Sequence, residues 1–180
     1  MSASFWRKLT LTSAALLLAL DVASRAQAPS PPPAPLTPAQ ITLDEARAII
    51  EGAIAFAHEA NLRMSVVVLD EATNVVSSAR MDGAGVQNVH FAEGKAFASA
   101  VFRQTTQALA DVAKTRPDRY FGIMNQYGPK VYLVGGGVPL QVDGKLVGGV
   151  GVAGLAEFED ERAGRAGIAA WEKVRGNLRK

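Results

Sequence analysis

The chain has 180 residues, with 19 basic and 17 acidic side chains and no cysteine. The lack of cysteine excludes disulfide bonds and thiolate-bound metals. Beyond the first 28 residues, basic and acidic side chains balance at 16 each. This balance gives no support for binding nucleic acid or anionic lipid through bulk charge.

The N-terminus has the layout of a secretory signal peptide. Two basic residues, Arg7 and Lys8, precede an apolar run and a small-residue segment that ends at Ala28. This order is typical of a cleaved export signal, so we assign residues 1–28 to it, with cleavage after Ala26 as the alternative. The protein is therefore expected to be periplasmic or secreted.

A proline-rich segment follows the predicted signal peptide. Six of the nine prolines lie between positions 29 and 38, a composition that favours extended chain with little burial. We therefore predict a linker at residues 29–40 and one folded domain at residues 41–180, whose length suits a single core.

The domain is predicted to begin with a helix and a hairpin. Thr42 and Glu45 have the spacing of a capping box, and the apolar residues that follow recur at helical spacing over 43–60. Two runs rich in β-branched residues, 64–70 and 75–81, flank a turn-like segment and predict a β-hairpin.

The second half of the domain is predicted to alternate between helices and strands. Helices are expected at 86–103 and 106–113, followed by an irregular stretch that contains Tyr127. Asp143-Gly144 is a strong hairpin signal between two of the next strands. The strands are expected at 131–134, 138–142 and 145–153, with the turn between the last two, and the closing helix is expected at 159–177. The sequence thus predicts an α+β fold, with an antiparallel sheet of about five strands and flanking helices.

Three motifs connect the chain with a known family. They are Arg80-Met81-Asp82-Gly83-Ala84, Gly135-Gly136-Gly137-Val138-Pro139-Leu140 and Gly148-Gly149-Val150-Gly151-Val152-Ala153-Gly154. Together they resemble the GlcG/HbpS family, the haem-degrading domain, over roughly residues 41–172. Asp160 and Arg165-Ala166-Gly167 also agree with the family pattern, whereas the hairpin carries Thr73-Asn74 where a glycine is usual.

The resemblance implies a profilin-like fold and a haem or other tetrapyrrole ligand. It further implies roles in haem uptake or oxidative haem degradation, and assembly into homo-oligomers. Two other functions stay open: an accessory sensor that docks on a membrane partner, and an organic-acid-binding protein linked to glycolate metabolism. The residues do not decide whether the protein is an enzyme.

His90 is the candidate axial ligand of the haem iron. On a helix over 86–103, His90, Gly94 and Phe97 share one face, and Gly94 indicates that something approaches the helix closely there. The close neighbour is either a porphyrin or another part of the chain. Surface exposure or a satisfied core position is the alternative interpretation of His90. The other histidine, His58, is assigned to the C-terminal end of the first helix, where a cation complements the helix dipole.

Lys95 and Arg103 are candidate cations for a ligand carboxylate. Lys95 lies in Gly94-Lys95-Ala96, which matches a motif that the family generally carries, and Arg103 lies almost on the same side of the helix. The alternative for Lys95 is a solvated charge or a salt bridge with Asp82 or Glu93.

The glycine runs and Tyr127 complete the candidate site. Gly135 and Gly136 are expected either to form a tight bend or to let a flat ligand approach the backbone. The glycines of 148–151 are expected to mark close packing of a helix or of another subunit. Tyr127 is expected either to line the pocket or to cap the core.

Overall fold

The computed structural model describes residues 40–154 and 157–179. The predicted signal peptide and nearly all of the predicted linker lie outside these residues. None of the described helices is both long and apolar enough to cross a lipid bilayer.

Four antiparallel strands within the described residues form one sheet, in the order β2-β1-β4-β3. They are Ser65–Asp70 (β1), Val75–Arg80 (β2), Gly137–Val142 (β3) and Lys145–Ala153 (β4). The predicted α+β class is confirmed, as are the hairpins β1–β2 and β3–β4. Asp143 and Gly144 between β3 and β4 have φ of 51° and 74°, as the favoured two-residue hairpin turn requires.

The predicted fifth strand, at residues 131–134, is wrong. Val131 and Leu133 are buried in a cluster with helix residues. The Tyr132 N–H donates to the carbonyl of Gly94 at 3.2 Å, in a helix, and not to a neighbouring strand. The segment is apolar because it packs beside a helix, and a short apolar run does not distinguish that role from a strand.

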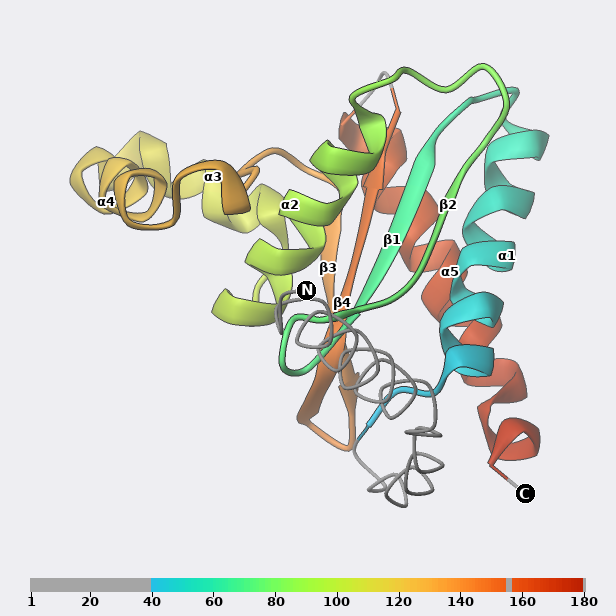
Figure 1. The fold of residues 1–180 in the computed structure, drawn as a ribbon. Coiled ribbons are helices and arrows are strands. Elements are labelled where there is room, and N and C mark those ends of the chain that lie inside the picture. The colour runs from blue at the N-terminus through green and yellow to red at the C-terminus, as the bar shows by residue number, and fades with distance from the viewer. Residues whose placement is uncertain (1–39, 155–156, 180) are drawn as a thin grey trace, which may run out of the picture. The chain divides into compact units, whose positions relative to one another are not determined.

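The helices lie on both faces of the sheet. Figure 1 shows α2 on one face and α1 with α5 on the other. Helices α3 and α4 lie to the side of α2, and α3 also contacts the start of β3. The stretch expected to be irregular around Tyr127 is a helix, α4, which begins with a proline in its first turn. The helices are Leu43–Glu59 (α1), Asn88–Phe102 (α2), Thr106–Thr115 (α3), Pro117–Tyr127 (α4) and Glu157–Leu178 (α5), with a 3₁₀ turn (η1) at Gly128–Lys130.

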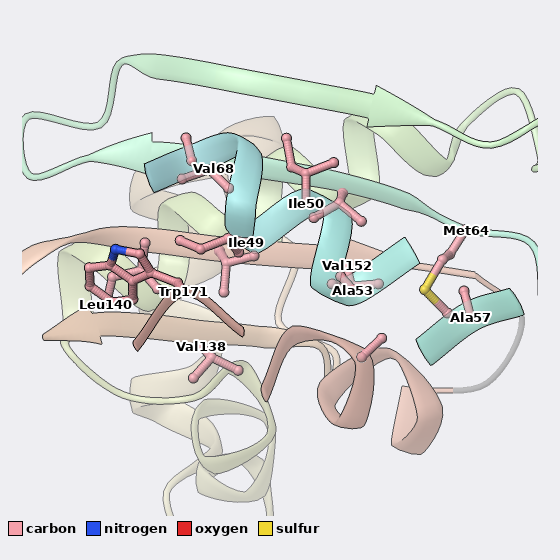
Figure 2. Packing of buried hydrophobic residues seen from close by; sticks show 14 of the residues in the cluster. Ile49, Ile50, Ala53, Ala57, Met64, Val68, Val138, Leu140, Val152 and Trp171 are labelled. Carbon is pink, nitrogen blue, oxygen red and sulfur yellow. The ribbon is translucent and has the colours of Figure 1, made fainter. Parts of the chain in front are cut away.

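Strand β1 separates two apolar layers. Its side chains alternate between the faces, so Val66 and Val68 join the core under α1 and α5, and Val67 and Leu69 face α2. Figure 2 shows part of the larger core, where side chains of α1 and Trp171 of α5 meet the strands. Burial on both faces explains why β1 is apolar along almost its whole length.

A buried carboxylate joins the N-terminus of α1 to the C-terminal part of α5. The predicted capping box is confirmed, and Glu45 accepts hydrogen bonds from Arg179 Nε at 2.8 Å and from Arg175 Nε at 3.2 Å. Burial raises the pKa of Glu45, but hydrogen bonds from Arg179 and the Thr42 N–H outweigh it and lower the pKa to about 2. Glu45 is therefore ionised at neutral pH despite being fully buried.

Candidate functional site

A cavity of about 330 Å³ lies beside α2, on the side of the β1–β2 turn and η1. We call it the α2 cavity; it is lined by Leu69, Thr73, His90, Glu93, Gly94, Phe97, Pro129 and Lys130. Its volume falls in the range of small-molecule sites, which begins at about 300 Å³. Because His90, Glu93, Pro129 and Lys130 are exposed, the cavity opens to solvent.

Helix α2 supplies one wall of the cavity through a single face. His90, Glu93, Gly94 and Phe97 recur at steps of three and four residues, as one face of an α-helix requires. The opposite face carries small side chains, including Ala92 and Ala96, which are fully buried. The sequence-based prediction that His90, Gly94 and Phe97 share one face is confirmed.

The small face of α2 lies directly on strand β4. A Cβ at Gly149 would lie 2.8 Å from Ser99 Oγ, and one at Gly151 would lie 2.5 Å from the backbone nitrogen of Ala96. Neither position has room for a side chain while the helix stays where it is. Gly149 and Gly151 thus mark close packing of a helix, which was one of the two predicted alternatives, whereas Gly148 faces the backbone of Leu69 in β1.

The group that packs closely against Gly94 is another segment of the same chain, residues 131–132. A Cβ at Gly94 would lie 3.0 Å from both the nitrogen and the Cβ of Tyr132, and the Tyr132 ring stacks on Phe91 with 4.4 Å between centroids. The glycine therefore lets the segment at residues 131–132 pack against α2. A porphyrin is not needed to explain why position 94 is a glycine.

The hairpin turn that supplies Thr73 is held by Asp70. Asp70 accepts hydrogen bonds from the backbone N–H of Asn74 at 2.8 Å and from its side-chain amide at 3.1 Å. Thr73 takes a left-handed backbone, with φ of 67°, at this position. A local side-chain bond thus supports a left-handed conformation that glycine adopts more readily than threonine.

Lys95 lies in a buried ion pair with Asp160. Lys95 Nζ donates to Asp160 Oδ2 at 2.8 Å and to the carbonyl of Val152 at 2.9 Å, and the residue is 2% exposed. The predicted salt bridge with Asp82 or Glu93 is wrong, because Lys95 points to β4 and α5. Lys95 does not line the α2 cavity.

The glycine bend before β3 packs around this ion pair. Gly136 has φ of 123°, and a Cβ there would lie 2.8 Å from Asp160 Cβ and 2.9 Å from Lys95 Nζ. The next residue is fixed by Thr106 Oγ1, which accepts a hydrogen bond from the Gly137 N–H at 2.7 Å. Gly135 and Gly136 are buried and outside the α2 cavity, so the geometry favours the tight bend over ligand approach.

Neither Arg103 nor Tyr127 is among the residues that line the α2 cavity. Arg103 ends α2 with a left-handed backbone, φ 55°, and an exposed side chain. The Tyr127 ring lies edge-on to Phe97 and Phe102, with centroids at 5.8 and 5.6 Å. Tyr127 thus caps a core cluster, and a direct contact of either residue with a ligand stays a prediction.

Sequence reasoning missed the cation of this cavity, Lys130. It lies on η1, which contacts α2, and the next residues, 131 and 132, pack against Gly94. Its position next to Gly128 and Pro129 predicts a turn but no site. Within the described residues, no three histidine, aspartate or glutamate side chains come together as a metal site.

Comparison with known proteins identifies the family. Residues 41–169 match the model of the haem degrading protein HbpS-like family. The chain belongs to this family. It is similar to the crystal structure of HbpS, with 31% identity, a TM-score of 0.66, and 77% of this chain and 93% of that chain covered.

Two further relatives of this HbpS-like protein extend the comparison. The crystal structure of a PduOC–haem complex has 25% identity and a TM-score of 0.68, and the match covers 73% of this chain and 94% of that one. An uncharacterised 15.0 kDa protein of Citrobacter freundii is 31% identical over 122 residues, which cover 68% of this chain and 85% of the relative. The resemblance to GlcG/HbpS proteins predicted from the glycine motifs is confirmed.

Proposed function

We propose that this HbpS-like protein binds haem in the α2 cavity, with the imidazole of His90 as an axial ligand of the iron. One observation carries the proposal: the cavity places an exposed imidazole next to the apolar side chains of Leu69 and Phe97. Imidazole is a common axial ligand of haem iron. The family description and the haem complex of the PduOC neighbour support the same ligand.

The residues of the cavity fit the chemistry of haem. A tetrapyrrole is a flat apolar ring with carboxylates at one edge, and Phe97 and Leu69 offer apolar contact to such a ring. Lys130 offers a cation to a carboxylate, whereas the carboxylate of Glu93 repels one. We therefore propose that the propionate edge is directed toward Lys130. Bound haem would supply redox chemistry, and oxidative breakdown of haem is a further proposal that depends on its binding.

Absorbance titration with ferric haem tests the site. We expect a saturable Soret shift with the wild-type protein, and a weaker shift at a different wavelength with His90→Ala. The matched control is His58→Ala, which removes an exposed histidine outside the α2 cavity and should titrate like the wild type. The absence of a Soret shift in the wild type would refute haem binding. Identical spectra for His90→Ala and the wild type would refute ligation by His90.

Export completes the proposal, because a signal peptide at residues 1–28 would place the haem site outside the cytoplasm. Mass spectrometry of the protein recovered from its host should give a mature chain that starts after Ala26 or Ala28. Docking on a membrane sensor and homo-oligomerisation stay predictions of the family resemblance.

A further inference from the structure

A second cavity, of about 400 Å³, lies beside the C-terminal end of α1. We call it the arginine cavity; it is lined by Ile54, His58, Arg63, Arg80, Met81 and Asp82. These residues come from α1, the loop before β1, and the end of β2 with the turn after it. Because α1 and α2 lie on opposite faces of the sheet, this cavity is separate from the α2 cavity (Figure 1).

Two arginines of this cavity are held in place without an acidic partner. Arg63 Nη1 donates to the carbonyl of Leu62 at 2.9 Å, and Arg80 Nη1 donates to the carbonyl of Ala84 at 2.8 Å. No carboxylate in the described part of the chain forms an ion pair with either guanidinium. A guanidinium has five N–H donors, so each arginine keeps donors for a ligand while one backbone bond restricts its position.

The turn after β2 brings the two arginines to the same place. The Ala84 N–H donates to the carbonyl of Met81 at 3.0 Å, and Gly83 between them has φ of 81°. This turn positions the carbonyl that holds Arg80. A Cβ at Gly83 would lie 3.9 Å from Arg63 Cγ, so the Arg63 side chain runs along the same turn.

The other walls determine which anion fits. Ile54 is partly buried and Met81 is 8% exposed, so the cavity has an apolar side. At the C-terminal end of α1, the carbonyls of Phe56, Ala57 and His58 already accept hydrogen bonds from backbone N–H groups. The N–H donors of the arginines are therefore left for a ligand. Asp82 adds one negative charge, which disfavours a multiply charged anion more than a singly charged one.

We propose that the arginine cavity binds a small organic carboxylate with an apolar body. The carboxylate lies on the guanidinium groups of Arg63 and Arg80, where planar N–H pairs match its two oxygens. The apolar body lies on Ile54 and Met81. Inorganic phosphate would contact only the arginines of the arginine cavity, and a neutral analogue of the carboxylate would contact only its apolar side chains.

The two histidines of the chain allow the two cavities to be observed separately. His58 lies in the arginine cavity and His90 in the α2 cavity, and the sequence has no other histidine. Benzoate, titrated into the purified protein, should shift the ring C–H proton NMR signals of His58 in a saturable manner. The signals of His90 should not move. Haem added in a separate titration should perturb His90, so failure of one site does not imply failure of the other.

Specificity is tested with two comparison ligands. Benzyl alcohol keeps the ring of benzoate without the charge, and inorganic phosphate keeps a negative charge without the ring. Each should bind roughly tenfold more weakly than benzoate, because a charge-assisted hydrogen bond or the burial of a ring is lost. Phosphate binding as tight as benzoate binding would overturn the apolar part of the proposal. An unmoved His58 signal at saturating benzoate would overturn all of it.

Substitutions distinguish the site from nonspecific charge. Arg63→Gln or Arg80→Gln should each weaken benzoate binding roughly tenfold, whereas Arg119→Gln, an exposed arginine on α4, should not change it. Asp82→Asn removes the repelling carboxylate and should tighten binding by roughly two- to fivefold. A misfolded variant would not gain affinity, so this gain also excludes loss of structure. Equal affinities for Asp82→Asn, Arg63→Gln, Arg80→Gln and the wild type would overturn the proposal.

Discussion

The buried Lys95–Asp160 pair gives the sharpest prediction about stability. Both residues are almost fully buried, at 2% and 3% exposure, and their charged atoms are 2.8 Å apart. Lys95→Met keeps most of the side-chain volume but leaves the Asp160 carboxylate buried without this cation. Breaking such a pair on one side costs about 3–5 kcal/mol of unfolding free energy.

Urea unfolding, followed by far-UV circular dichroism, measures this loss. With an m-value of about 2 kcal/mol/M, typical for a domain of this size, the midpoint should fall by about 2 M. The double variant Lys95→Met with Asp160→Leu removes both charges and should recover much of the loss, because no buried charge of the pair remains. Lys114→Met is the matched control, since Lys114 is 76% exposed in its pair with Asp111 and should cost less than about 1 kcal/mol.

The same variant separates a structural role of Lys95 from a ligand-binding role. Because Lys95 points away from the α2 cavity, haem affinity per folded molecule should stay unchanged in Lys95→Met. A variant with wild-type stability and weakened haem binding would refute our placement of Lys95 and restore the predicted contact with a propionate.

Two further predictions concern Glu45 and the contact between α2 and β4. The pKa of Glu45 is about 2 in the folded protein, against 4.5 for the free group. Ionised Glu45 therefore adds about 3 kcal/mol to the unfolding free energy, which is fully present above pH 5 and lost as the pH falls toward 2. In Glu45→Gln the unfolding free energy should therefore fall less steeply between pH 5 and pH 2 than in the wild type. An equally steep fall in the variant would contradict this. Gly151→Ala places a Cβ against the Ala92 carbonyl and should cost about 3 kcal/mol in urea unfolding, whereas Gly122→Ala, which meets open space on α4, should gain up to about 1 kcal/mol.

Periodicity predicted most of the fold because most elements bury a regular face. The apolar spacing of α1 and α5 and the β-branched runs of β1 and β2 each gave an element within a few residues of its observed bounds. Helix α4 was missed although Tyr120, Ile123, Met124 and Tyr127 recur at helical spacing and pack in one cluster. The helix is short and its buried residue is Ile123, so we took these side chains for part of an irregular stretch. Residues 131–134 were mistaken for a strand because their burial comes from packing on α2.

The candidate site was predictable only where one element carries it. His90, Gly94 and Phe97 could be placed together because they are three positions on one helix. Lys130 and Thr73 reach the same cavity from distant parts of the chain, and no local pattern indicates that they meet. The partner of Lys95 lies 65 residues away on α5, which explains why the nearer Asp82 and Glu93 were chosen instead.

Helix α2 restricts how the ligand preference of this protein can change. Its inner face lies on the backbone of β4, and the nearby segment 131–132 fills the space beside Gly94, so the helix cannot tilt or accept larger side chains there. The β1–β2 turn and η1 are less restricted, since Thr73 lies in a turn held by a local Asp70–Asn74 contact and the side chains of Pro129 and Lys130 are exposed. Evolution or design can therefore vary these two turns to accept a different molecule while α2 keeps presenting His90 from the same fixed position.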